Sequence, residues 1–163
     1  ITAENLRGIP FSPCRFDVFS MTSALFLATV FGRDHDRQVI DAYDQLDREI
    51  VRKDGYLYGW SCLSNLLRAL VVNDKYSNSR STELIVQVLS RIQTPEGDWQ
   101  GKVPFYLTLN ALAHLDMPIA NSQVDSALKR IYRTQSRNGS WGKAEPEFAT
   151  FLVVHALKRK GIL

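Results

Sequence analysis

The sequence predicts an all-helical domain built from helix hairpins of equal length. A pattern of residues recurs every 42 positions, which is the signature of a repeat architecture, and apolar residues recur at helical spacing within each copy. Glycine and proline fall where the predicted helices end or begin. We therefore expect almost no β-strand.

The repeat is clearest in two segments that share three residue types. The pairs are Gln93 and Gln135, Gly97 and Gly139, and Trp99 and Trp141, and the members of each are 42 positions apart (135 − 93 = 42). An eroded third copy keeps glycine at Gly55 but has Val51 and Leu57 in place of glutamine and tryptophan. The register continues into the flanking segments, in columns such as Leu67, Leu109 and Phe151.

Each repeat divides into an amphipathic segment and an apolar one. In residues 122–135, apolar side chains such as Val124 and Ile131 recur on one helical face, and charged side chains occupy the other. Residues 105–115 and 148–157 are apolar on most sides, as expected for helices that neighbours enclose. Outer and inner helices should therefore alternate. The predicted helices are residues 16–31, 36–53, 61–73, 81–93, 103–115, 122–135 and 147–159.

Capping residues and prolines mark the predicted helix starts. Ser81 precedes one helix, and Asn121 or Ser122 precedes another, where a side-chain oxygen accepts a hydrogen bond from an unpaired backbone N–H. Pro104 and Pro146 lie near the first turns of inner helices, where the missing N–H costs little. The repeated glycine stands where the chain leaves an outer helix, a place that often requires a left-handed residue.

Length and composition indicate a single globular domain over residues 1–163, with an irregular segment at 1–15. The chain is 45% hydrophobic and 23% charged, enough for a sizeable core. Its 20 basic and 17 acidic residues are interspersed, which argues against a nucleic-acid partner. No segment approaches ~20 consecutive apolar residues, so no transmembrane span is expected. We expect a cytoplasmic location, with a membrane-peripheral one as the alternative.

Motifs for metals, cofactors and nucleophiles are absent from the sequence. Cys14 and Cys62 are predicted to be free thiols, because two cysteines at this spacing fit neither a disulfide framework nor a zinc site. His155 on an inner helix and His114 near a helix end are interpreted as structural, hydrogen-bonded side chains. No cofactor is expected, and no metal ligand is assigned.

The two best copies of the repeat resemble the QW motif, a glutamine followed by Gly-x-Trp, of squalene-hopene cyclases, oxidosqualene cyclases and related prenyltransferase and squalene oxidase repeats. The resemblance covers about residues 37–163. It implies an α/α toroid, present here as a partial barrel or arc, whose inner helices line a cavity. It also implies that the Gln amide stacks on the Trp ring, which gives a structural role to Gln93, Gly97, Trp99, Gln135, Gly139 and Trp141.

The chemical motifs of these families are missing from this chain. Class II terpenoid cyclases protonate an alkene with a DxDD motif, but the nearest stretch, residues 18–24, has no acid. Residues 41–47 place acids on one helix face without the paired carboxylates of a magnesium-binding DDxxD run. Protein prenyltransferases hold zinc with Asp-x-Cys, and here Trp60 stands where that aspartate would precede Cys62. The catalytic residues stay unknown.

The resemblance leads us to expect part of a class II-type terpenoid or squalene cyclase that supplies cavity wall rather than the catalytic acid. The chain holds fewer hairpins than a closed toroid of the family, so the remaining helices are expected from a parent protein or a homo-oligomer partner. Aromatic faces suit an isoprenoid cavity because they stabilise carbocations. The alternative is a non-catalytic toroid scaffold or an isoprenoid- or protein-binding module. The cavity-wall candidates, for which core filling stays the alternative, are Phe19, Trp60, Tyr106 and Phe148.

Overall fold

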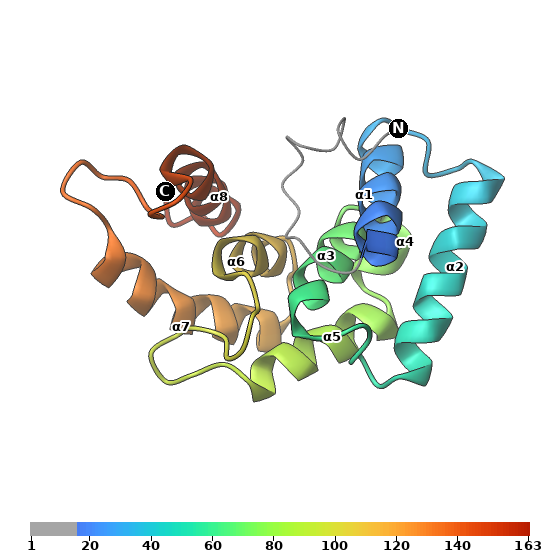
Figure 1. The fold of residues 1–163 in the computed structure, drawn as a ribbon, viewed down its shortest axis with the longest axis horizontal. Helices are drawn as coiled ribbons and strands as arrows, with labels where there is room; N and C mark the ends of the chain where they lie inside the picture. The colour runs from blue at the N-terminus through green and yellow to red at the C-terminus, as the bar shows by residue number, and fades with distance from the viewer. Residues whose placement is uncertain (1–15) are drawn as a thin grey trace.

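The computed structural model describes residues 16–163, and all the regular structure in this part of the chain is helical (Figure 1). The prediction of an all-α fold is confirmed. The helices are α1 (Phe16–Val30), α2 (Arg37–Arg52), α3 (Trp60–Val71), α4 (Asp74–Ser77), α5 (Arg80–Arg91), α6 (Phe105–Ala113), α7 (Pro118–Thr134) and α8 (Pro146–Arg159). Within these residues, the only β-type pairing is an isolated bridge between Gln93 and Trp99.

The helices form two rows that curve together (Figure 1). In the inner row, α1, α3, α6 and α8 pack side by side in that order, and in the outer row α2, α5 and α7 do the same. The one-turn helix α4 packs against both α3 and α5. The chain thus passes from an outer helix through a loop into an inner helix, as the alternation of amphipathic and apolar segments predicts.

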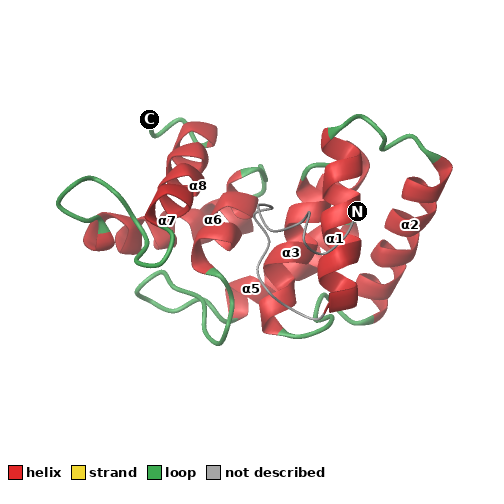
Figure 2. Cartoon of the chain, turned by 45° about the horizontal axis from the view of Figure 1, so that its top comes forward, coloured by secondary structure: helices red, strands yellow, loops and turns green. Residues whose placement is uncertain are grey.

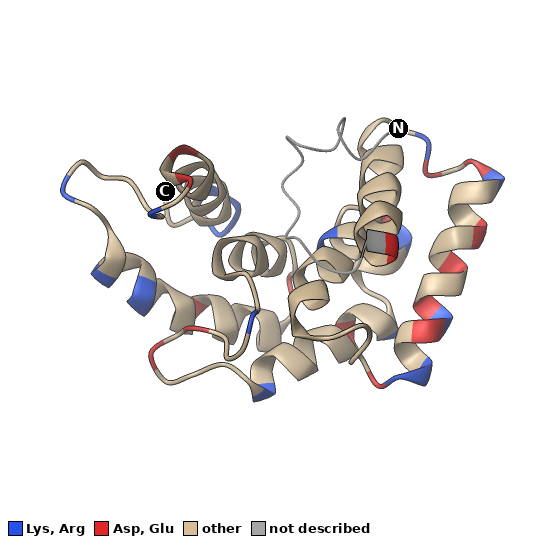
Figure 3. Ribbon diagram, in the orientation of Figure 1, with Lys and Arg blue, Asp and Glu red and all other residues tan. Residues whose placement is uncertain are grey.

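The hydrophobic core lies between the two rows. Helices α3 and α6 are enclosed along most of their length, and on α3 Leu63, Leu66 and Leu70 are all fully buried. The outer helices contribute residues such as Ile85 and turn charged residues outward, which Figure 3 shows for α2. Inner helices are enclosed on most sides and outer helices on one side, which is why the sequence alternates apolar and amphipathic segments.

The loops that follow the outer helices repeat the same backbone geometry. Figure 2 shows the long loops after α5 and α7 in green. In the first, the Thr94 amide donates to the Asp98 carbonyl (2.7 Å), and in the second the Ser136 amide donates to the Ser140 carbonyl (2.8 Å). The repeated glycines all have left-handed φ values of 81°, 85° and 84°, at Gly55, Gly97 and Gly139. The 42-residue repeat of the sequence is therefore also a repeat of the backbone structure.

Two predicted helix starts are wrong. Helix α7 begins at Pro118, so Asn121 and Ser122 lie inside the helix rather than at its cap. Proline fits this first position because its fixed φ is already helical and its missing N–H needs no partner there. In α5 the cap is Ser79, whose hydroxyl accepts from the Thr82 amide (3.4 Å), and Ser81 is the second helical residue.

Other expectations are met or fall outside the described part. Pro104 caps α6 and Pro146 opens α8, as predicted. Cys62 is a buried free thiol. Cys14 and the irregular segment expected at residues 1–15 lie outside the described residues. Among the described residues, no helix combines the length and apolar content needed to cross a bilayer.

Candidate functional site

The loop after α5 is fastened to the next outer helix by a buried glutamine that sequence reasoning missed. Gln123 on α7 is only 1% exposed. Its side-chain oxygen accepts from Trp99 Nε1 (3.2 Å), and its backbone carbonyl accepts from Gln93 Nε2 (2.8 Å). Its own amide donates to the Val86 carbonyl on α5 (3.0 Å). Gln123 therefore joins the loop, α5 and α7 in one network.

The equivalent loop after α7 keeps the residues but contacts no further outer helix among the described residues; its Trp141 amide donates to Thr150 Oγ1 on α8 (2.9 Å). Gln135 Nε2 donates to the Gly139 carbonyl of its own loop (2.9 Å), and both residues are exposed. Trp141 Nε1 donates to the Ile131 carbonyl of the preceding helix (2.8 Å). Both tryptophan rings are buried. Stacking of the Gln amide on the Trp ring stays a prediction.

The structure brings Tyr106 and Phe148 together in one apolar cleft. The two residues occupy equivalent positions in neighbouring repeats (148 − 106 = 42), on α6 and α8, which pack against each other. The cleft has a volume of about 290 Å³. We call it the aromatic cleft; its helical lining is Phe105, Tyr106, Leu107, Phe148, Ala149 and Leu152, with Pro104 and loop residues 142–145 completing it.

A second cleft of about 300 Å³ adjoins the first, because Leu152 lines both. Its apolar walls come from all four inner helices and include Phe26 and Phe151. Its polar residues lie on α3, α6 and α8. We call it the polar-floored cleft; its polar lining consists of Arg68, Asn110, His114 and His155.

The polar residues form a ladder across three inner helices. Arg68 Nη1 donates to Asn110 Oδ1 (3.0 Å), and Asn110 Nδ2 donates to the Leu152 carbonyl (3.2 Å). Residues 68, 110 and 152 are successive members of one repeat column, so the ladder follows the 42-residue register. Asn110 Nδ2 also lies 3.0 Å from His155 Nδ1. Burial lowers the pKa of Arg68 to about 10, which leaves the guanidinium charged at neutral pH.

The two histidines of this cleft both have a lowered pKa. Burial, with Arg159 and His155 as the next contributors, lowers the pKa of His114 to about 4. Burial and the nearby Arg159 also lower the pKa of His155. Their rings lie 5.2 Å apart. A general base works best with a pKa near the working pH, so His114 does not fit that role, in keeping with the structural interpretation.

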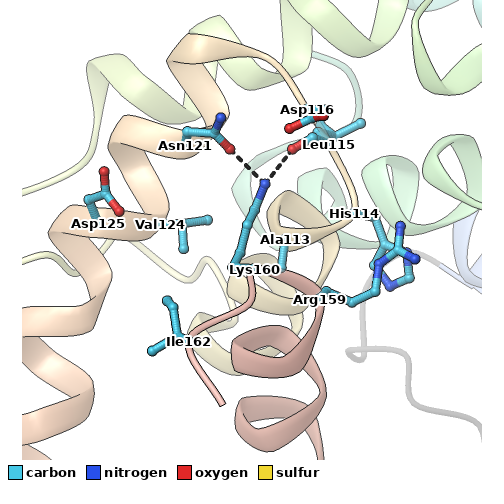
Figure 4. A pocket seen from close by; sticks show the side chains of 10 residues that line it. All are labelled: Ala113, His114, Leu115, Asp116, Asn121, Val124, Asp125, Arg159, Lys160 and Ile162. Carbon is cyan, nitrogen blue, oxygen red and sulfur yellow. Dashed lines mark hydrogen bonds between the residues drawn. The ribbon is translucent and has the colours of Figure 1, made fainter.

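A third pocket, of about 510 Å³, surrounds Lys160 at the end of α8 (Figure 4). Lys160 Nζ donates to the Leu115 carbonyl (2.6 Å) and to Asn121 Oδ1 (2.6 Å). Asp116 and Asp125 also line the pocket. The lysine therefore connects the end of α8 to the turn after α6 and to helix α7. The mixed charges make this pocket unsuited to a hydrocarbon.

The other two cavity-wall candidates lie apart from these clefts. Phe19 is half-buried on α1. Trp60 opens α3, is 37% exposed and packs against Tyr56 with ring centroids 4.5 Å apart. Neither residue lines the aromatic cleft or the polar-floored cleft.

The acidic run on α2 has a surface role. Asp44 accepts hydrogen bonds from Lys75 Nζ (2.8 Å) and from the Tyr76 hydroxyl, which attach α4 to α2. These two donors lower the pKa of Asp44. Over residues 16–163, no group of three or more His, Cys, Asp or Glu side chains is arranged to hold a metal ion.

No family model, no curated protein and no solved structure matches this chain. The fold and the site therefore define its class: an all-helical repeat protein with two adjoining, largely apolar clefts on its inner row.

Proposed function

We propose that this chain is an arc of an α/α toroid of the class II terpenoid cyclase type, and that it supplies wall to an isoprenoid cavity. The observation that carries the proposal is the aromatic cleft. Tyr106 and Phe148 come from adjacent inner helices at equivalent repeat positions and line one apolar space. The QW-like loops and the two rows of helices support the same assignment.

The chemistry of the cleft suits a hydrocarbon chain. Removing apolar surface from water stabilises a complex by roughly 25 cal/mol per Å², and the helical lining of the aromatic cleft is apolar apart from the tyrosine hydroxyl. The aromatic rings of Phe105, Tyr106 and Phe148 add faces that attract a carbocation. Because Leu152 borders both clefts, an elongated ligand meets apolar surface on either side of it.

The catalytic acid of the reaction lies outside this chain in our proposal. Protonating an alkene requires a strongly acidic carboxyl group, and the sequence contains no DxDD motif. The chain by itself should therefore bind isoprenoids without cyclising them.

Binding of squalene or geranylgeranyl diphosphate, followed by tryptophan fluorescence, tests the proposal. Phe148→Ala should weaken binding at least about tenfold, because it removes one of the three aromatic rings that line the cleft. The matched control is Val51→Ala, an exposed position on the outer helix α2, which should leave binding unchanged. Mass spectrometry of the same mixtures should show unchanged substrate. The proposal fails if the wild-type chain binds neither lipid, or if Phe148→Ala binds as tightly as wild type.

A non-catalytic scaffold is the second candidate. It is favoured by the hydrogen-bonded ladder through Arg68 and Asn110, which fills part of the inner row with polar contacts between helices. On this alternative the clefts are packing defects, and neither lipid shifts the fluorescence.

A further inference from the structure

The interface between successive repeats is filled twice within this chain. Gly55 packs on the backbone of α5, where a Cβ atom would overlap the carbonyl group of Leu84. Gly97 packs on α7 in the same way, where a Cβ atom would overlap the carbonyl group of Ser126. Leu84 and Ser126 are themselves one repeat apart (126 − 84 = 42). Each of these two loop glycines therefore packs on the next outer helix at the equivalent backbone position.

The third copy of this interface has nothing packed on it. A Cβ atom on Gly139 would meet only Gln135 Nε2, at 3.9 Å. On the inner row, Leu67 and Leu109 are fully buried, but Phe151 in the same column is 61% exposed. Tyr132 on α7 is 66% exposed as well. We call Tyr132, Gln135, Gly139 and Phe151 the C-terminal edge.

The opposite end of the array carries the other side of this interface, the outer-helix surface on which a loop glycine packs. The residue one repeat before Leu84 is Ala42, on the outer helix α2. Among the described residues, no earlier repeat supplies a loop glycine that could pack on it. Exposed apolar side chains lie at this end too, with Phe31 75% exposed and Ile40 36% exposed. We call Phe31, Ile40 and Ala42 the N-terminal edge.

We propose that a second copy of this chain docks head to tail, with its N-terminal edge on the C-terminal edge of the first. In this contact Gly139 meets the backbone at Ala42 of the other copy, as Gly97 meets Ser126 within one chain. The contact continues an interface that the protein already forms twice, and it covers the exposed Phe151 and Tyr132 rings. It goes beyond the proposed ligand site, because it needs no ligand.

The two edges carry different charges. Figure 3 shows basic residues at the end of α7 and in the loop that follows, where Lys129, Arg133 and Arg137 lie. Helix α2 carries four acidic residues against three basic ones, and Asp41, Asp44 and Glu49 already form ion pairs with Arg37, Lys75 and Arg52. The two edges differ from each other, so the contact is heterologous, and it builds either a closed ring or a growing chain of copies.

The test uses one blocked variant for each edge, and sedimentation velocity over a concentration series reads out the assembly. Gly139→Asn adds a side chain to the docking point but leaves the fold intact, since asparagine tolerates positive φ and the space is open. Gly101→Asn is its matched control, at a φ of 74° in the middle of the chain. Ala42→Arg blocks the other edge. If Ala42→Arg is unfolded by circular dichroism, Phe31→Arg replaces it.

The proposal predicts that the wild type and Gly101→Asn associate, and that each blocked variant alone associates at least about tenfold more weakly. Mixing Gly139→Asn with Ala42→Arg should restore association and stop it at a one-to-one dimer, because one intact edge of each kind remains. A wild type that stays monomeric throughout the concentration series overturns the proposal. So does a mixture that fails to form the dimer. If the wild type stays monomeric, the C-terminal edge would be a surface for a helix hairpin of another protein.

Discussion

At the scale of the residue, His114 shows how the packed inner row controls charge. Its ring lies in the polar-floored cleft, and every charged or titratable group that contributes to its shift is basic: Arg159, His155, Arg68 and Lys160. Burial and this positive surrounding both penalise the imidazolium, so the pKa falls to about 4. An unfolded chain would hold the same ring at about 6.5.

This difference makes stability depend on pH in a predictable direction. As the pH falls from about 6.5 to about 4, the unfolded state binds a proton that the folded state does not, so the free energy of unfolding decreases. Because the ring is partly exposed, we expect a loss of only ~1 kcal/mol from this residue. Urea unfolding of His114→Gln at several pH values should show a smaller decrease than the wild type. His35→Gln, an exposed histidine, is the control, and equal slopes for wild type and His114→Gln would contradict the assignment.

At the scale of the element, periodicity predicts the long helices well and the short connections poorly. Helix α4 was not predicted because four residues are too few for a periodic signal; tertiary contacts hold it, including the stacking of Tyr76 on Tyr43 with centroids 4.8 Å apart. The cap preferences of asparagine and serine misplace the start of α7, because the helix begins earlier, at Pro118. Tyr106 and Phe148, two of the sequence's cavity-wall candidates, line the aromatic cleft, and their contact with an isoprenoid stays a prediction.

The polar network between elements could not be predicted, because a buried polar residue looks the same in sequence as an exposed one. The spacing of Arg68 and Asn110 was a usable signal, since two polar residues one repeat apart on apolar helices suggest a shared contact. Gln123 had no such signal. Its repeat equivalent is Ser81, and only the structure shows that both are buried.

Gln123 joins α5, α7 and the loop after α5 through buried hydrogen bonds. Gln123→Leu should destabilise the protein by ~2–4 kcal/mol, because it leaves Trp99 Nε1 and the Val86 carbonyl buried without these partners. Gln45→Leu, at an exposed position on α2, should change the stability by less than ~0.5 kcal/mol. Chemical denaturation measures both. A loss no larger than that of Gln45→Leu would show that the network is not needed.

At the scale of the whole molecule, the structure is one interface used repeatedly. A left-handed glycine recurs in all three loops, and its contact with the carbonyl group of the next outer helix recurs at the first two. Such an array gains stability from contacts between neighbours, so its end modules differ from its middle ones in exposure rather than in fold. The positions of the clefts follow from this, since equivalent residues of adjacent modules lie side by side on the inner row.

Urea unfolding of three glycine variants tests this account most directly, at a protein concentration low enough to keep copies apart. Gly55→Ala and Gly97→Ala should each lose ~3 kcal/mol or more, because the new methyl group overlaps a neighbouring helix backbone in addition to the strain of positive φ. Gly139→Ala should lose only ~1 kcal/mol, from the backbone strain alone. Equal losses at all three positions would contradict the account, because they would mean that the first two glycines receive no neighbouring module.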